Sequence, residues 1–541
     1  MDDLPNEITA LAGSNQDFCT DAEKEKAKTL RSNHQANLAT ISSKISLIDE
    51  EIGRLQSHRE TLLPKRDREL SNIAILEATL NPLRRVPSEV LCEIFLCCLS
   101  DTGCAAPTLD MVRAARTVLS LCQVCSKWRR TALEFPPLWK ALGIRTKCTL
   151  KDQTTMIHPA VSSVLEIWFA RAGSCVLSLG LVLFPSTGFL ETSRLTLRLK
   201  NLLEQLSDSR LQHLSLTTVH VGDAYFLSQI FREFRELESI FLSSEFHSWY
   251  PHMMPRPTRL LRSAPRLRSA ELHNFIHHFS PMFLPWSQLT HLHVEGGFTE
   301  SMWYSLIGYC TNLRHGVFSV DCSANDPMIV TSNHNSIFPH LVDLTVHAVT
   351  SKTPKFRQLV FPALQRLQLL SDWTLPEVYQ WNSAYFPRGY TSSLTKLVLI
   401  GPTFFTESQV QSFLQTLPSL TEFHLSITLN YLTFLDALIN TQFLPKLETF
   451  HCDIQKIGRS DSRILQQLIS FVQSRVSDPH TTCLAVQLRH LSLKFPVGWD
   501  YVDHLHQILA PFRDQGLLLV LGTIKDDHPD FKKMMRYDLD L

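Results

Sequence analysis

The stretch LPSLTEFHLSI (residues 417–427) is one copy of a short phrase that recurs along the chain. Close variants are FPHLVDLTV (338–346), FPALQRLQL (361–369) and LPKLETFHC (444–452). The end of each phrase alternates apolar residues with other residues, which is the pattern of a strand with one buried face. A single copy cannot bury its leucines, whereas a stack buries each copy against the next. The recurrence therefore predicts strands packed side by side.

The pattern Leu-x-x-Leu-x-Leu, with substitutions, defines a repeat. It starts at Leu211, Leu237, Leu267, Leu289, Leu313, Leu341, Leu364, Leu394, Leu420, Leu447 and Leu488. Successive starts are 22 to 30 residues apart, except for a last interval of 41 residues, and leucine-rich repeats have a period of 20–29 residues. We therefore expect an α/β fold, a leucine-rich-repeat solenoid over 160–525 with a parallel sheet inside and helices outside. Residues 164–183 would form its first unit or its cap, and 516–522 its last strand.

Bulk composition excludes several classes of partner. The chain of 541 residues has 52 basic and 52 acidic residues, so no net charge favours nucleic acid or an anionic membrane. Its N-terminus has no visible signal peptide, and its longest apolar stretch, residues 175–184, is about half of the ~20 residues that a membrane helix needs. We expect a cytoplasmic and/or nuclear protein whose 13 cysteines are mostly thiols.

A heptad seam marks the N-terminal part of the chain. Between a flexible N-terminus over 1–21 and the next module, a helix is expected over 22–81. Because Pro64 interrupts helical hydrogen bonding, a kinked helix and a helical hairpin both fit. The helix packs either on its own chain or on a second copy, in a homodimer through 30–63. The seam consists of Leu38, Ile41, Ile45, Ile48, Ile52, Leu55 and Leu62, broken by Arg59 and resumed by Ile73, Leu76 and Leu80.

A small all-α module is expected over 82–140. Its first helix follows Pro87 and has an apolar stripe formed by Val90, Leu91, Ile94, Phe95, Cys98 and Leu99. A second helix, starting near Ala115 and ended by Pro136 and Pro137, has Val118, Leu121, Cys122, Cys125 and Trp128 on one face.

Three pieces of this module resemble an F-box in their order and spacing. They are Pro87-x-Glu89-Val90-Leu91-x-x-Ile94-Phe95, then Val124-Cys125-x-x-Trp128, then Pro137-Leu138-Trp139. The chain is similar to the F-box-like proteins abundant in mushroom-forming fungi, which place a heptad helix before the module. Degenerate leucine-rich repeats are common behind F-boxes.

The resemblance implies a substrate-recognition subunit of an SCF-type cullin–RING ubiquitin ligase. Such a subunit binds the ligase adaptor, and through it the cullin, holds a protein substrate on its repeats and has no catalytic residues. Adaptor docking, or positioning of the docking helices, would fall to Pro87, Glu89, Val90, Ile94, Phe95, Val124 and Trp128.

A scaffold is the rival interpretation, in which the F-box-like helices only cap the solenoid. A receptor predicts a separable module over 82–139, and a scaffold predicts helices buried against the repeats with no free apolar patch. A third class, an enzyme that uses cysteines, would need a depressed thiol pKa in a cleft.

Two groups of cysteines and histidines could bind a metal, but their positions favour packing or surface roles. Six cysteines lie between Cys92 and Cys125, and zinc binds such ligands, but Cys92, Cys98, Cys122 and Cys125 fall in apolar stripes, which favours core packing. His273, His277 and His278 run from a strand into a loop, where a surface or packing role is expected. No metal or cofactor is therefore expected.

An arginine run points to a solvated surface, and motifs for several enzyme classes are missing. Arg256, Arg259, Arg262, Arg266 and Arg268 form a run that is expected on the solvated side of a helix whose buried stripe is Leu260, Leu261 and Ala264. Phosphate-binding, zinc-protease and hydrolase motifs are not visible.

Histidines are concentrated on the expected concave face. Beside the strand leucines lie His213, His273, His291, His293, His315, His347, His424, His451 and His490. Either this slot of the repeat tolerates histidine, or these residues form a neutral binding face whose charge rises below about pH 6.5. In the second case the substrate-binding residues are His213, His291, His293, His347, His424, His451 and His490.

Overall fold

The computed structural model describes most of the chain and divides it by internal contacts into two compact units, Met1–Pro87 and Ser88–Leu541. The expected terminal tail over 526–541 and residues 1–19 lie outside the described residues. The described ranges are 20–80, 82–100, 107–145, 160–183, 210–218, 234–244, 263–274, 284–321, 336–349, 356, 359–371, 392–401, 407–427, 429–440, 443–454, 462–476 and 486–524.

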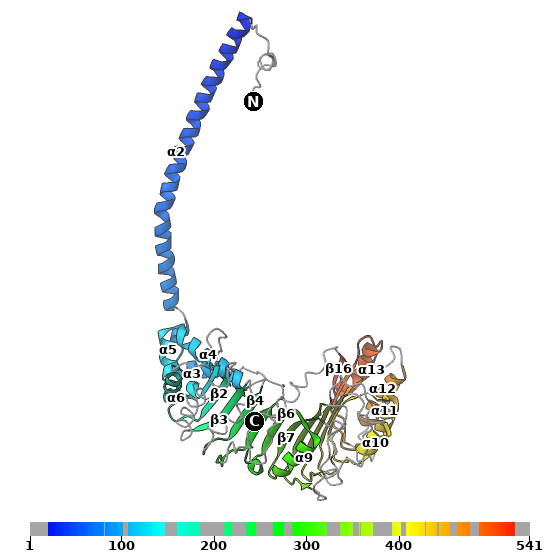
Figure 1. Cartoon of the computed structure of the whole chain (residues 1–541). Helices are drawn as coiled ribbons and strands as arrows, with labels where there is room; N and C mark the ends of the chain where they lie inside the picture. Colours follow the sequence, from blue (N-terminus) through cyan, green and yellow to red (C-terminus); the bar gives the residue numbers. More distant parts are fainter. Residues whose placement is uncertain are drawn as a thin grey trace. The chain divides into compact units, whose positions relative to one another are not determined.

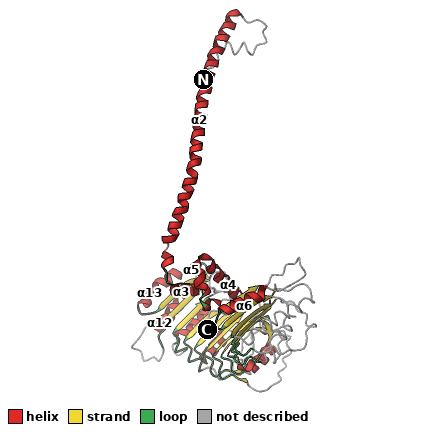
Figure 2. Ribbon diagram, turned by 90° about the vertical axis from the view of Figure 1, so that its left-hand side faces the viewer, coloured by secondary structure: helices red, strands yellow, loops and turns green. Residues whose placement is uncertain are grey.

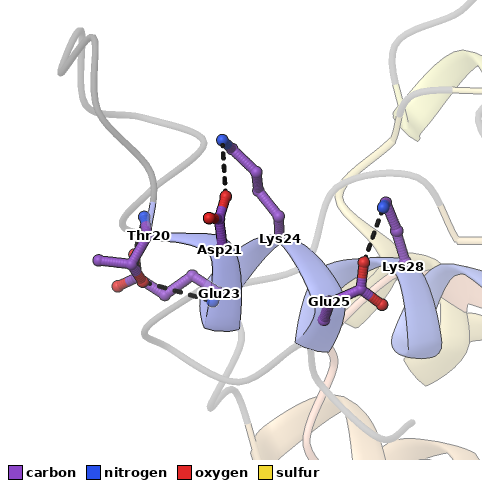
Figure 3. Close-up of polar contacts among 6 residues, drawn as sticks. All are labelled: Thr20, Asp21, Glu23, Lys24, Glu25 and Lys28. Carbon is purple, nitrogen blue, oxygen red and sulfur yellow. Dashed lines mark hydrogen bonds and ion pairs between the residues drawn. The ribbon is translucent and has the colours of Figure 1, made fainter.

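The first unit is one long helix, α2 (Asp21–Leu80, 60 residues), followed by the 3-10 helix η1 (Pro82–Arg85). It begins with a capping box, in which the Thr20 hydroxyl accepts from the Glu23 backbone N–H at 3.4 Å and the Glu23 carboxylate accepts from the Thr20 N–H at 2.8 Å (Figure 3). Ion pairs of Lys24 with Asp21 and of Lys28 with Glu25 follow in the next turns (Figure 3). The capping box satisfies N–H groups that the first turn of a helix leaves without helical partners, and the ion pairs join side chains on the helix surface.

The heptad seam of α2 is uncovered within its own unit. Its seam residues are exposed by 45% (Ile52) to 71% (Leu80). The helix continues through Pro64, so it is not a hairpin, and Figure 1 shows it as one gently bent rod. A helix of this length measures ~90 Å. Helix propensity alone stabilises isolated helices only weakly in water, so packing of the seam would add to the stability of α2.

The second unit is built on one parallel sheet of 14 strands whose order in the sheet is their order in the chain (Figures 1 and 2). The expected α/β class with a long parallel sheet is confirmed. The strands are β1 (Ala141–Arg145), β2 (Leu177–Leu183), β3 (Leu211–Thr218), β4 (Ser239–Ser244), β5 (Ser269–His273), β6 (His291–Thr299), β7 (His315–Asp321), β9 (Asp343–Ala348), β11 (Arg366–Ser371), β12 (Lys396–Gly401), β13 (Glu422–Ile427), β14 (Thr449–Asp453), β15 (His490–Pro496) and β16 (Leu518–Ile524). Two short strands, β8 (Ser336–Ile337) and β10 (Leu359–Val360), pair separately.

Each recurring phrase leads into one strand and hydrogen-bonds to the preceding unit. The backbone N–H of Arg314 donates to the Thr290 carbonyl at 2.8 Å, Val342 to Arg314 at 2.9 Å, and Gln365 to Val342 at 2.8 Å. Alternate strand residues, such as Leu397 and Leu399 of β12, are completely buried on one side, which we call the core face. The other side, here called the polar face after its histidines and carboxylates, carries the residues between them, but it includes a buried apolar cluster of Val317, Leu370, Val398 and Ile400. A unit therefore needs its neighbours both for its backbone and for its leucines.

Helices connect several neighbouring strands and cover the core face. In Figure 1, α10–α13 stand along one side of the sheet. Aromatic contacts join the two layers: Phe434 of α11 lies 6.3 Å from Phe423 of β13, and Phe471 of α12 lies 5.6 Å from Phe450 of β14. The helices are α6 (Ala160–Arg171), α9 (Glu300–Tyr309), α10 (Glu407–Gln415), α11 (Tyr431–Ile439), α12 (Ser462–Val476) and α13 (Val502–Asp514), and a 3-10 helix, η5 (Trp286–Gln288), precedes β6.

Four short helical elements close the first end of the sheet. They are α3 (Ser88–Ser100), α4 (Pro107–Val124), α5 (Ser126–Leu133) and η2 (Pro136–Trp139). The helix expected to run on from Ala115 to Pro136 is instead two helices, because Cys125 is extended (φ −158°, ψ 172°) and caps α5. Its Sγ accepts a hydrogen bond from the Trp128 N–H at 3.4 Å.

Strand β1 lies between α4 and α6, and no copy of the recurring phrase predicted it. A Cβ placed on Gly143 would meet the backbone of Met111 and Val112, with the Val112 Cα at 2.7 Å, so α4 packs directly on the polar face of β1. From the other side, the Trp168 indole of α6 donates to the Ala141 carbonyl at 3.2 Å. By internal contacts α3–α5 belong to the same compact unit as the sheet, so the separable module that the receptor interpretation predicts stays a prediction.

Candidate functional site

The surface of α3–α5 contains the first set of predicted site residues. Pro87, Glu89, Val90, Ile94 and Val124 are exposed, with exposed fractions of 47%, 40% and 59% for the three apolar side chains Val90, Ile94 and Val124. Val90 and Ile94 are four residues apart on α3, so they share one face of that helix. These five side chains are available to a partner.

The other two predicted residues hold the helices together. Phe95 is completely buried, and its ring lies 5.0 Å from that of Trp128, which is half-buried. Trp139 joins the module to α6. Its indole N–H donates to the Ala132 carbonyl at 2.8 Å, and its ring packs edge-on against that of Trp168 on α6, with 4.6 Å between the ring centroids. Phe95 and Trp128 therefore position the exposed side chains of this surface.

The cysteines of this module do not behave as predicted. Cys98 and Cys125 were expected in the core and are exposed, because α3 presents Cys98 to solvent and Cys125 stands in the break between helices. Burial, with the charges of Glu89 and Glu93, raises the pKa of the Cys92 thiol; burial also raises that of Cys122, against the charges of Arg171 and Arg129. Neither thiol is activated as a nucleophile. Among the described residues these cysteines form no cluster that could hold a metal ion.

The polar face of the sheet carries the second set. All nine histidines named above lie on strands β3, β5, β6, β7, β9, β13, β14 and β15. His273 and His293 are buried, with 8% and 7% of their surface exposed, and the other seven are partly buried. Several rings contact each other across strands, for example His291 and His315, which stack at 4.5 Å, and His451 and His490 at 4.8 Å.

The closest polar cluster is a two-by-two arrangement on β5 and β6. The sheet register pairs Glu271 with His293 and His273 with Glu295. His273 Nε2 lies 2.6 Å from Glu271 Oε1, and His273 Nδ1 lies 2.8 Å from Glu295 Oε2. His293 Nδ1 is 3.4 Å from Glu271 Oε1, while the buried His293 Nε2 has no hydrogen-bond partner.

This cluster is electrostatically coupled. Burial acts to lower the pKa of His273, but hydrogen bonds to Glu271 and Glu295 and their charges outweigh burial and raise it to about 9. Burial acts to raise the pKa of Glu271, but hydrogen bonds from His273 and His293 and their charges lower it to about 2. Two carboxylates and two imidazoles thus concentrate charge at one place on the polar face.

The expected charging of the whole face below about pH 6.5 is not supported at four of its histidines. Burial lowers the pKa of His213, His291 and His315; neighbouring basic groups add to this effect at His291 and His315, whereas at His213 the charge of Glu238 opposes it. At His451, burial and the charges of His424 and His490 lower the pKa to about 4. These rings stay neutral to a lower pH than free histidine, because the partly covered face solvates their charge poorly.

Only part of the arginine run lies among the described residues. Arg256, Arg259, Arg262, Leu260, Leu261, His277 and His278 lie outside the described residues. Ala264 is buried as expected, but the residues from Ala264 to Arg268 form a turn and not a helix. Arg266 pairs with Glu236, which lies in the turn before β4.

Sequence reasoning overlooked the acidic partners of the histidines. Glu271, Glu295 and Asp453 share the polar face with them, and Asp453 lies 3.9 Å from the Nε2 of His424. The available signal was the pair of motifs Glu-x-His at 271–273 and His-x-Glu at 293–295, which puts both residues of each motif on one side of a strand.

Comparison with known proteins adds no relative. No protein-family model matches the chain, and no curated protein matches its sequence. Of the helices that the structure describes, none combines the length and apolar character required to cross a membrane.

Proposed function

We propose that the chain is a substrate-recognition subunit of an SCF-type cullin–RING ubiquitin ligase. In this proposal α3–α5 are an F-box-like docking surface for the adaptor, and the sheet is a leucine-rich-repeat solenoid whose polar face holds a protein substrate. The subunit would be non-catalytic and would act by raising the local concentration of substrate near the ubiquitin-charged enzyme.

The exposed apolar side chains of α3 and α4 support this proposal best. Val90, Ile94 and Val124 are exposed on helices that pack around the buried Phe95, and Leu119 of α4 is exposed as well. A helix that serves only as a cap gains nothing from leaving such side chains in water, since each costs solvation free energy that a partner would recover. The rival scaffold interpretation explains the packing of α4 on β1, but not these exposed residues.

The repeat interpretation is supported by sheet order and spacing. Parallel strands follow one another in chain order, and helices connect neighbouring strands on the core face. Such arrays present one long face of strand residues, which suits recognition of an extended partner surface.

We further propose that α2 forms a homodimer through its seam. If Leu38 is heptad position a, then Lys44 is position g and Asp49 is position e, so a parallel pair brings Lys44 of one copy close to Asp49 of the other. The exposed seam supplies the apolar contact, and this charge pair favours a second copy in parallel orientation over an unrelated helix.

Adaptor binding by the full chain tests the main proposal. Because α3–α5 pack on the sheet, the whole chain is used and not an excised module. Wild type, the double variant Val90→Asp/Ile94→Asp and the control Ile167→Asp are compared by titration calorimetry against the ligase adaptor; Ile167 is similarly exposed (54%) but lies on α6.

We expect wild type and control to bind equally, and the double variant to bind ~30-fold more weakly or not at all, from ~1–2 kcal/mol per buried side chain. Circular dichroism should show all three folded. Absence of adaptor binding by folded wild-type protein would reject the proposal and leave the scaffold interpretation.

A further inference from the structure

We propose that Glu271, His273 and His293 form a binding site for a divalent transition-metal ion of the Zn²⁺ class on the polar face of the sheet. The inference concerns residues of β5 and β6 and does not depend on the adaptor-binding function.

The geometry brings three ligand atoms together from two adjacent strands. One atom from each of the three residues lies within 4.8 Å of the others, and this is the one such group among the residues that the structure describes. Glu271 Oε1 is already 2.6 Å from His273 Nε2 and 3.4 Å from His293 Nδ1. Ligands around a tetrahedral zinc ion stand ~3.3 Å apart, so the two imidazole nitrogens must close by up to ~1.5 Å, which rotation of the histidine rings can supply. The strands themselves are fixed by their hydrogen bonds in the sheet.

Burial gives these ligands a reason to bind an ion. His293 is 7% exposed, and its Nε2 is buried without a hydrogen-bond partner. The His293 nitrogen nearest the site is Nδ1, 3.4 Å from Glu271 Oε1, so Nε2 gains the ion as its partner only when the ring turns. Rotation of the imidazole about its Cβ–Cγ bond lets either nitrogen turn toward Glu271.

The fourth member of the arrangement provides the outer support that metal-binding histidines usually have. With His273 Nε2 on the ion, its Nδ1 donates to Glu295, whose Oε2 already lies 2.8 Å away. Such a carboxylate fixes the ring orientation and the tautomer of the ligand. Two imidazoles and one carboxylate match the zinc sites that keep a fourth position open.

The open position would face outward from the sheet. The side chains of Glu271 and Glu295 are 29% and 23% exposed, against 11% and 8% for His273 and His293, so the carboxylate side is the accessible one. An ion held here would offer its free position to water or to a ligand atom of a bound molecule.

The polar face also contains a matched control. His424, His451 and Asp453 form a second cluster on β13 and β14, but His424 Nε2 lies 3.9 Å from Asp453. It is not among the groups of metal-ligand atoms found in the described part of the chain. His451→Gln therefore removes a histidine from the same face without touching the site.

The experiment uses the full chain, stripped with a chelator, in which Zn²⁺ binding is measured by competition with a chromophoric chelator. We compare wild type, Glu271→Gln, His273→Gln, His293→Gln, Glu295→Gln and the control His451→Gln. The ligand variants should lose at least ~100-fold in affinity for one equivalent of zinc, Glu295→Gln ~10–100-fold, and the control nothing. Thermal unfolding should show full zinc stabilisation of wild type and control, less for Glu295→Gln, and least for the three ligand variants.

X-ray absorption on the zinc-loaded wild type provides a second readout if a variant does not fold. Nitrogen and oxygen ligands with imidazole scattering support the proposed site, and a sulfur shell would overturn it, because the chain has 13 cysteines that compete for zinc. Zinc binding by folded His293→Gln with wild-type affinity and stoichiometry would likewise overturn it, as would absence of a tight equivalent in wild type.

Discussion

Replacing Arg475 by Met should destabilise the second unit strongly. Arg475 lies on α12 with 4% of its surface exposed, and burial lowers the pKa of its guanidinium to about 10. It donates to the Leu438 carbonyl from Nε at 3.2 Å and from Nη2 at 2.9 Å, and to the Leu444 carbonyl from Nη1 at 2.9 Å. Further bonds reach the carbonyls of Asn440 and Phe443.

These acceptors belong to the end of α11 and the turn that follows it. The last carbonyls of a helix have no helical partner, so Arg475 acts as a side-chain cap from a neighbouring helix. The turn includes Leu444 with φ of 51°, a conformation that costs a non-glycine residue free energy. Arg475 therefore holds a strained turn by four carbonyl groups.

The size of this destabilisation follows from the buried carbonyl groups that lose their donor when Arg475 is replaced by methionine. Each buried carbonyl without a donor costs ~1–3 kcal/mol, and removal of the desolvated charge returns part of the total. We expect Arg475→Met to lower the free energy of unfolding by ~3–5 kcal/mol, a large share of the ~5–15 kcal/mol of an ordinary domain.

Urea unfolding followed by circular dichroism measures this change, with Arg463→Met as control. Arg463 is on the same helix and exposed, so its replacement should cost less than ~0.5 kcal/mol. Amide hydrogen exchange should also speed up over residues 438–444 in Arg475→Met. A loss below ~1 kcal/mol with unchanged exchange would refute the view that this arginine caps α11.

Three further outcomes are expected. Ile45→Asp/Ile52→Asp should convert a dimer to a monomer in sedimentation equilibrium, while a wild type that is already monomeric at micromolar concentration would contradict the seam proposal. Gly143→Ala should lower stability by ~1–3 kcal/mol, because its methyl group meets the backbone of α4; unchanged urea unfolding would show that α4 is free to shift. His451 has a lower pKa in the folded chain than the ~6.5 of an unfolded one, so the unfolded state takes up the proton first and stability falls as pH drops from about 6.5 to about 4. His451→Gln should remove ~1–2 kcal/mol of that acid sensitivity, the linkage value halved for a half-exposed ring; parallel pH–stability curves of the two proteins would contradict the shift.

The sequence predicted the repeated strands because their pattern is local. Leucines two residues apart identify the core face of each strand without knowledge of its neighbours. Strand β1 was missed since its five residues contain no copy of the phrase, and glycine at 143 signals close approach only once α4 is placed. The break at Cys125 was also missed, because the apolar positions on both sides continue in helical phase.

The candidate sites depended more heavily on packing. For the helical surface, the sequence named seven residues but could not separate Phe95, which is buried, from Ile94, which is exposed. The cluster on β5 and β6 depends on register: Glu271 and His293 are 22 residues apart and become partners only when the two strands align. A shift of one residue in the pairing of β5 with β6 would have put Glu271 on one face of the sheet and His293 on the other.

The agreement between sheet order and chain order has a consequence for synthesis on the ribosome. Each strand of the 14-stranded sheet pairs with the strand made just before it, so a newly emerged unit finds its partner already folded. Assembly can then advance in the direction of translation. The leucines of one unit stay exposed only until the next few dozen residues have been made and the following unit covers them. Helix α2 emerges before any of the sheet, which gives two neighbouring nascent chains time to pair while their repeats are still being made.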